Sequence, residues 1–289
     1  MNSEVAVKVF RVSHRDDVTK VMTKFRLEAE TLRTLRHPNI CFFFDTCLVH
    51  GSPAIVLELL CGGTLGQHLG LRKAKEVSTI TAGEGACSAT LPSSPSSCWS
   101  AIPSSELLQL ARDVASGLHY LHVNGVSHRD VKESNVMIDR GQMVRAKLCD
   151  FGISALKTAT NEYPSRSFSS IGTCRYQAPE LTQLMSKAAD RNTSRDMLDI
   201  INDTLTDVYS YGLVLYEISH GCIAFGGLSG FHAMLQAYDG ERPPIALVRP
   251  ELAPLGAVIE TCWDAEVERR PNMQKVLQAL SSLMLETLP

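Results

Sequence analysis

Two short polar segments near the middle of the chain limit most strongly what it can fold into. Residues 128–135 read HRDVKESN, and the tripeptide DFG follows at 150–152. Apolar residues on both sides of a polar turn predict a hairpin over 136–149, which would hold the two segments next to each other. Two carboxylates, a lysine and a carboxamide are therefore expected to converge.

These functional groups are the ones that phosphoryl transfer requires. Asp130 can accept a hydroxyl proton, and Lys132 can neutralise charge on the moving phosphoryl group. Asn135 and Asp150 can supply oxygen ligands for magnesium. The alternative is a solvated charge cluster in a turn, but two complete motifs at this spacing disfavour that interpretation.

The two segments resemble the catalytic loop and the metal-binding segment of eukaryotic protein kinases, H-R-D-x-K-x-x-N and D-F-G. The resemblance implies an α+β, two-lobed fold. A small antiparallel-sheet lobe, incomplete at its start, would occupy residues 1–60, and a mainly helical large lobe would occupy 61–289. It also implies ATP and Mg²⁺ as cofactors, Asp130, Lys132 and Asn135 as catalytic residues, and Asn135 and Asp150 as metal ligands.

A valine-rich run at 4–10, EVAVKVF, predicts a buried strand that contains Lys8. Such a lysine ordinarily points outward at a sheet edge, but VAVK is similar to the kinase V-A-I-K strand, whose lysine holds the α- and β-phosphates. Residues 16–35 predict a helix whose apolar stripe, from Val18 to Leu32, includes Glu28. A carboxylate on an apolar face is costly unless it is paired, so we expect Glu28 to pair with Lys8.

Residues 40–49 and 54–60 predict two further strands. The second, AIVLELL, is followed by CGGTL and resembles the hinge between the kinase lobes, which implies that Leu57 gates the adenine pocket. On this resemblance the residues that contact ATP are Ala6, Lys8, Glu28, Leu57, Glu58, Leu60, Met137 and Asp150.

The large lobe is predicted to contain amphipathic or buried helices at 104–123, 207–218 and 273–285. The segment that ends in GTCRYQAPE resembles a kinase activation segment, and a phosphate added there by an activating kinase, or removed by a phosphatase, would supply an anion for Arg129. Asp207 is expected to hydrogen-bond the catalytic-loop backbone, and Arg270 to pair with Glu180. The implied structural and regulatory residues are His128, Arg129, Phe151, Gly152, Thr173, Glu180, Asp207 and Arg270.

The sequence departs from the family in three places. Residues 72–103 are rich in small and polar residues and predict a mostly disordered, low-complexity insertion. Residues 182–205 predict a second insertion that is partly helical. No G-x-G-x-x-G loop precedes the lysine strand, so either the sequence is truncated at its start or the protein lacks this cover over ATP. We favour truncation, because the sequence retains all the side chains expected to act in catalysis: Lys8, Glu28, Asp130, Asn135 and Asp150.

Composition limits the partners and the compartment. A net charge of −3 argues against nonspecific nucleic-acid binding, and no apolar run approaches the length of a membrane span. Nine scattered cysteines without a CxxC pair suggest reduced thiols in the cytoplasm, or in the nucleus.

The expected function is transfer of the γ-phosphoryl group of ATP to hydroxyl groups of protein substrates. Lys132, two residues after the aspartate, is typical of serine/threonine kinases, while the HPNI turn and the C-W…R-P ending resemble the tyrosine-kinase-like branch. A pseudokinase-like scaffold without turnover is the alternative. The missing glycine loop favours that alternative, and the complete set of catalytic side chains opposes it.

Overall fold

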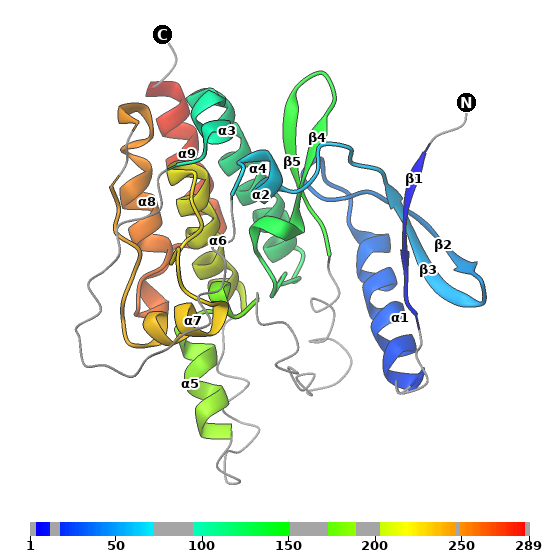
Figure 1. Ribbon diagram of the computed structural model, residues 1–289. Helices are drawn as coiled ribbons and strands as arrows, with labels where there is room; N and C mark the ends of the chain where they lie inside the picture. The colour runs from blue at the N-terminus through cyan, green and yellow to red at the C-terminus, as the bar shows by residue number, and fades with distance from the viewer. Residues whose placement is uncertain are drawn as a thin grey trace.

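The computed structural model describes residues 4–11, 18–71, 95–150, 173–188, 203–246 and 249–286. A small sheet with one helix lies on one side, a group of helices lies on the other, and a two-stranded hairpin stands between them (Figure 1). This is the two-lobed α+β arrangement that the sequence predicts.

The small lobe is a three-stranded antiparallel sheet with one helix packed on it. Its strands are β1 (Val5–Val9), β2 (Phe43–Val49) and β3 (Ser52–Glu58), in the order β1-β3-β2. Helix α1 (Val18–Thr34) contacts β2 and β3. Strand β1 forms one edge of the sheet, and its register places Lys8 opposite Ile55.

The predicted elements of this lobe are present, with three corrections. Strand β1 was expected to be buried, but its Val5 and Val7 are 40% and 44% exposed, because β1 lies at the edge of the sheet. Val18 was expected on the buried stripe of α1 but is 57% exposed, because it is the first residue of the helix. Residues 40–42 were expected within a strand but precede β2. Ile40 instead forms an isolated parallel bridge with Leu148.

The hairpin consists of β4 (Val136–Arg140) and β5 (Val144–Leu148), with Val136 opposite Leu148. It is bonded to the chain that enters the large lobe, because Gly62 N donates to Ile138 O at 3.0 Å and Ile138 N donates to Gly63 O at 2.8 Å. A Cβ at Gly62 would lie 2.4 Å from Ile138 O, so only glycine permits this close approach.

The large lobe is built around two buried helices. The leucine and valine residues that recur at helical spacing along α4 (Ser104–Val123) are all at most 1% exposed: Leu107, Leu110, Val114, Leu118 and Leu121. Helix α6 (Asp203–His220) is buried along most of its length and contacts α4 and α8. The remaining helices are α2 (Leu65–His68), α3 (Ser97–Ala101), α5 (Pro179–Ala188), α7 (Gly230–Tyr238), α8 (Leu255–Cys262) and α9 (Met273–Glu286).

The prediction of an irregular insertion is wrong for residues 95–103, which include α3. Trp99 is 2% exposed and its Nε1 donates to Ile218 O at 2.7 Å. The guanidinium of Arg249 lies 4.0 Å from the Trp99 ring centroid and donates to the Trp99 carbonyl at 2.6 Å. One buried tryptophan thus fixes a helix too short for its periodicity to be recognised. Residues 72–94 lie outside the described residues.

The second predicted insertion is partly helical, as expected. Helix α5 continues to Ala188, and α6 begins at Asp203, four residues before the predicted start. Residues 189–202 lie outside the described part of the chain. No helix in the described ranges is both long enough and apolar enough to cross a membrane.

Candidate active site

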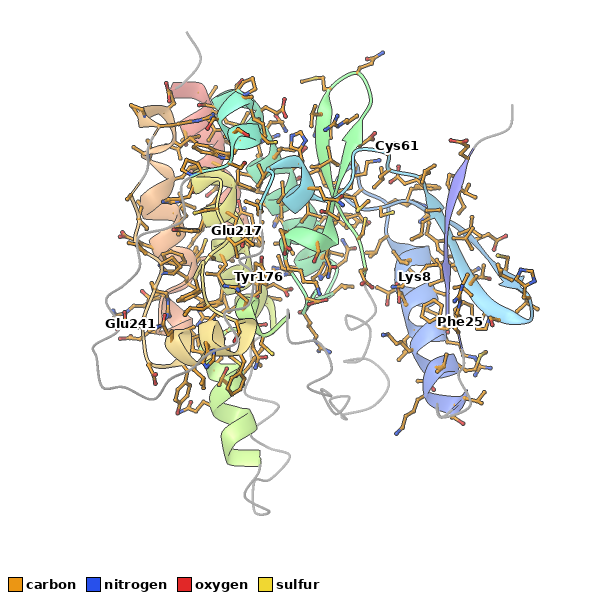
Figure 2. All side chains as sticks on the ribbon, viewed as in Figure 1. Lys8, Phe25, Cys61, Tyr176, Glu217 and Glu241 are labelled. Atoms are coloured by element: carbon orange, nitrogen blue, oxygen red, sulfur yellow. The ribbon has the colours of Figure 1, made fainter. Side chains whose placement is uncertain are left out.

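Lys8 lies on the side of the small lobe that faces the large lobe, where it bridges two carboxylates (Figure 2). Its Nζ is 2.6 Å from Glu28 Oε1 and 2.5 Å from Asp150 Oδ1. Strand β1, helix α1 and the chain that follows β5 therefore meet at one ammonium group. The predicted Lys8–Glu28 contact is present, and Asp150 joins it.

The environment determines the charges of these three groups. Burial lowers the pKa of Lys8, but the charges of Asp150 and Glu28 outweigh burial and raise it overall. Burial also raises the pKa of Asp150, but Lys8 more than offsets this and the net shift is downward. For Glu28, which is 1% exposed, burial outweighs the lysine and the pKa is raised. Glu28 is therefore the carboxylate that depends most on Lys8 for its charge.

Asp130 presents one carboxylate oxygen that is fully bonded and one that is not. Its Oδ2 accepts hydrogen bonds from Lys132 Nζ at 2.7 Å and from Asn135 Nδ2 at 2.8 Å. Its Oδ1 is buried and has no hydrogen-bond partner within the described residues. A buried acceptor without a donor costs about 1–3 kcal/mol. Such an oxygen fits a hydroxyl donor brought by a substrate.

Asp207 fixes the backbone of the catalytic loop, as the resemblance implies. This aspartate is 1% exposed and accepts from the backbone N–H groups of His128 and Arg129, both at 2.7 Å, and from His122 Nε2 at 3.0 Å. Arg129 has a φ of 63°, a left-handed conformation that is uncommon for residues other than glycine. The bonds from Asp207 hold it there.

His128 connects the two motif segments. Its Nδ1 accepts from Asp130 N at 3.3 Å, so its Nε2 carries the hydrogen and donates to Cys149 O at 3.1 Å. The segment at 128–135 is thereby tied to the residue that precedes Asp150.

A cavity of about 240 Å³ lies between the lobes at this point. It is lined by Lys8, Glu28, Leu32, Cys41, Leu57, Ser134, Asn135, Met137, Cys149 and Asp150. Five of the eight predicted ATP-contacting residues are in this lining. Ala6, Glu58 and Leu60 are not: Ala6 lies opposite Leu57 in the sheet, and the Glu58 side chain bonds elsewhere.

The Glu58 side chain forms a bridge that the sequence does not reveal. Its Oε2 lies 2.6 Å from Lys147 Nζ, and its Oε1 accepts from Phe42 N at 2.7 Å. Asp139 Oδ2 lies 3.4 Å from the same lysine. Burial lowers the pKa of Lys147, but the two carboxylates outweigh burial and raise it. The hinge and the hairpin are therefore joined by a charged contact.

The oxygen donors in the cavity fit magnesium. The Asn135 amide nitrogen is occupied by Asp130, which leaves its amide oxygen, and the Asp150 carboxylate lines the same cavity. The described residues contain no group of three or more His, Cys, Asp or Glu side chains that could enclose a metal ion. Two protein oxygens completed by phosphate oxygens are typical of magnesium in nucleotide sites.

Two further contacts lie within the large lobe. Arg270, with a fully buried side chain, donates to both Glu180 oxygens at 2.7 and 2.9 Å, as predicted. Tyr176 donates to Glu217 Oε1 at 2.8 Å, and burial with the nearby Glu133 charge raises the pKa of Glu217 to about 8 (Figure 2). Glu217 was not among the predicted residues, because only Asp207 was given a role in the helix predicted at 207–218.

Several predicted residues cannot be placed. Phe151, Gly152 and the activation-segment serines lie outside the described residues, and for Thr173 only the backbone, at the start of a 3₁₀ turn, is described. The phosphate expected opposite Arg129 therefore stays a prediction.

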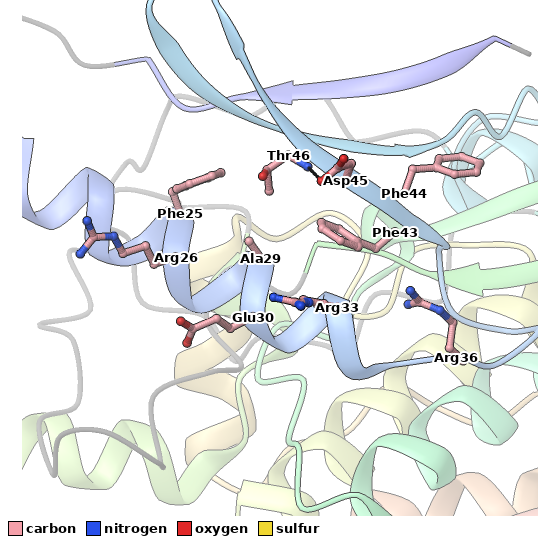
Figure 3. A pocket seen from close by; sticks show the side chains of 10 residues that line it. All are labelled: Phe25, Arg26, Ala29, Glu30, Arg33, Arg36, Phe43, Phe44, Asp45 and Thr46. Atoms are coloured by element: carbon pink, nitrogen blue, oxygen red, sulfur yellow. Dashed lines mark hydrogen bonds between the residues drawn. The ribbon is translucent and has the colours of Figure 1, made fainter.

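A larger hollow of about 560 Å³ lies on another face of α1 (Figure 3). Phe25, Ala29 and Phe43 lie between α1 and β2 there, and Arg26 and Arg33 are among its lining residues. It shares no lining residue with the smaller cavity and contains none of the catalytic groups. The smaller cavity, and not this hollow, therefore contains the side chains that the sequence predicts to contact a nucleotide.

The chain belongs to the protein kinase family, because the family model for protein tyrosine and serine/threonine kinases matches residues 1–280. It is 30% identical over 292 residues to the serine/threonine/tyrosine-protein kinase HT1 of Arabidopsis thaliana, covering 99% of this chain and 62% of that protein. It is 31% identical over 286 residues to the dual specificity protein kinase shkC of Dictyostelium discoideum, covering 98% of this chain and 47% of that protein.

The serine/threonine-protein kinase CTR1 of Arabidopsis thaliana is 28% identical over 290 residues, which cover 99% of this chain and 30% of that protein. These relatives are kinases of the tyrosine-kinase-like type, so the predicted branch is confirmed. The chain spans about half the length of the curated relatives it matches first.

Proposed function

We propose that this domain transfers the γ-phosphoryl group of ATP to serine and threonine hydroxyls of protein substrates. The observation that carries the proposal is the buried, unpaired Oδ1 of Asp130, held next to Lys132 by bonds to the other carboxylate oxygen. A substrate hydroxyl would donate to Oδ1, which orients the hydroxyl oxygen and accepts its proton.

The other residues bind and position the nucleotide. Lys8, fixed by Glu28, would exchange its bond to Asp150 for the α- and β-phosphates, and Lys132 would neutralise charge on the transferred group. Asn135 and Asp150 would hold magnesium, which supplies charge neutralisation on the phosphates. Leu57 and Met137 would face the adenine from the cavity walls. Backbone groups of Glu58 and Leu60, together with Ala6, would complete the contacts to the adenine.

The remaining roles are supporting ones. Asp207, His128, Glu180 and Arg270 would keep the catalytic loop and the activation segment in place through the bonds described above. A kinase or phosphatase acting on the activation segment would regulate the domain through Arg129. No disulfide joins any of the eight cysteines in the described ranges, which supports a reducing compartment such as the cytoplasm or the nucleus.

The test of the proposal is Asp130→Asn, which keeps the hydrogen bonds but removes the proton acceptor. Single-turnover phosphorylation of a generic protein substrate should fall at least about 100-fold, while the affinity for Mg·ATP stays within a few fold. Asp239→Asn, at an exposed helix end, is the matched control and should transfer like the parent.

Two outcomes would contradict the proposal. Transfer by Asp130→Asn at a rate close to that of the parent would remove Asp130 from the reaction. A parent chain that binds Mg·ATP but transfers no phosphate, with and without a phosphorylated activation segment, would favour the pseudokinase-like scaffold.

A further inference from the structure

Two cysteine thiols face each other across the wall of the nucleotide cavity. Cys41 and Cys149 both line it, Cys41 after α1 and Cys149 directly before Asp150. The residues that precede them, Ile40 and Leu148, pair in a parallel bridge, and Cys41 N donates to Leu148 O at 2.9 Å. The backbone therefore places the two cysteines side by side.

Their geometry is compatible with a covalent bond between them. Neighbouring strands lie about 4.8 Å apart, and disulfides occur at Cα separations of about 4.4–6.8 Å. Cys41, together with burial, raises the pKa of the Cys149 thiol well above its ordinary value, so the two sulfur atoms lie close together, and neither cysteine forms a disulfide within the described residues. Cys41 is only 5% exposed, so a reagent would reach it through the cavity. A volume of about 240 Å³ admits a small molecule, since one water molecule occupies about 30 Å³ of liquid.

We propose that Cys41 and Cys149 are a modification site at which a peroxide joins the two thiols in a disulfide and thereby weakens nucleotide binding. One thiol sulfur attacks a peroxide oxygen, which breaks the O–O bond, releases one water and leaves a sulfenic acid. The second thiol displaces the hydroxyl of that sulfenic acid as a second water. Two thiols and one hydrogen peroxide thus give one disulfide and two waters, with the sulfurs oxidised and the peroxide oxygens reduced.

The effect on the nucleotide follows from the position of Cys149. The next residue, Asp150, has a φ of 65° and is held by its bond to Lys8. ATP binding requires Lys8 to leave that bond and Asp150 to reorient toward magnesium, and a cross-link at the preceding residue restricts this change. This part of the inference rests on the proposed function, whereas formation of the disulfide does not. We expect oxidation to weaken Mg·ATP binding at least fivefold.

The test uses the full chain. Excess hydrogen peroxide is added, remaining thiols are blocked with an alkylating reagent, and peptide mass spectrometry locates the cross-link. Mg·ATP affinity is measured before oxidation, after it, and after reduction with dithiothreitol. Cys41→Ser and Cys149→Ser each remove one partner, and Cys47→Ser, which removes an exposed thiol on β2, is the matched control.

Three results together would support the proposal. Mass spectrometry should find a cross-linked Cys41–Cys149 peptide, and oxidation should reversibly weaken Mg·ATP binding by the parent and by Cys47→Ser. Oxidation should not weaken binding by Cys41→Ser or Cys149→Ser. Absence of that peptide after oxidation of the folded chain would overturn the modification site, and a cross-link that leaves affinity unchanged would overturn its effect on the nucleotide. A reduced chain that fails to bind Mg·ATP would instead count against the proposed function, while the peptide map would still decide the disulfide.

Discussion

Lys147 of the hairpin donates to Glu58 of the hinge at 2.6 Å, across the line where the two lobes meet. Both side chains are mostly buried, at 15% and 20% exposure. The carboxylate also accepts from Phe42 N, so one side chain joins β3, the residue before β2, and β5. The position of the hinge relative to the hairpin is therefore set in part by this ion pair.

Removing the lysine should loosen the hinge. Lys147→Met leaves the Glu58 carboxylate without its cation, and we expect a loss of about 1 kcal/mol in the free energy of unfolding. We also expect a several-fold rise in KM for ATP, with kcat changed less, because the hinge is proposed to contact the adenine and not the reacting phosphate. Lys147→Arg should restore most of both values.

Steady-state kinetics and urea unfolding would measure these effects, with Lys275→Met, at an exposed lysine on α9, as the control. A fall in kcat alone, with KM unchanged, would contradict a role at the hinge.

The Lys8–Glu28 pair should act as one unit. Glu28 is buried and depends on Lys8 for its charge, so Lys8→Met and Glu28→Gln should each weaken Mg·ATP binding. The double variant should be little worse than either single variant, with a coupling free energy on the order of 1 kcal/mol. Calorimetric titration of the three variants measures it. Glu30→Gln, on the exposed face of the same helix, should bind like the parent, and additive losses would show that the pair is not coupled.

Trp99 should be a main stabilising residue of the large lobe. Trp99→Ala removes a buried ring together with its contacts to Arg249 and Ile218, and we expect the free energy of unfolding to fall by about 3–5 kcal/mol. Trp99→Phe keeps an aromatic ring but loses the Nε1 bond, so it should cost less than Trp99→Ala. Urea unfolding followed by circular dichroism is the measurement, with Ser97→Ala at an exposed position of α3 as the control. Equal stability of Trp99→Ala and the parent would show that α3 is not anchored.

Glu217 should make stability depend on pH. Its pKa is about 8 in the folded chain and 4.5 without the fold, so between these values the folded state keeps a proton that the unfolded state releases. Raising the pH through this interval therefore favours unfolding. From pH 6.5 to 8 the contribution of this group should fall by on the order of 1–2 kcal/mol. His220, with a pKa lowered by burial to about 4, changes charge below this window.

Glu217→Gln can still accept the bond from Tyr176 but does not titrate, so its unfolding midpoint in urea should vary less between pH 6.5 and 8 than that of the parent. Glu260→Gln, at an exposed position of α8, should retain the pH dependence of the parent. The same slope in Glu217→Gln as in the parent would exclude this carboxyl group as its source.

The sequence by itself determined the family, the main elements and the groups that meet at the site. Helix α4 was predicted with its observed bounds, because leucine and valine recur there at helical spacing. The Lys8–Glu28 and Arg270–Glu180 contacts could be predicted because each residue lies in a recognisable motif. A carboxylate on an apolar stripe, such as Glu28, also requires a cationic partner, and this limits the residues that can pair with it.

Other features were decided only by the tertiary structure. Trp99 meets Ile218, Lys147 meets Glu58 and Cys41 meets Cys149 across long stretches of chain, with separations of 119 residues for the first pair and 89 for the second. None of these residues lies in a pattern that names its partner, since a side chain's type shows that it needs a contact but not which distant segment will provide it. The packing of the lobes selects that segment, because burial of the apolar faces fixes the backbones first and the polar contacts form where those backbones bring suitable groups together.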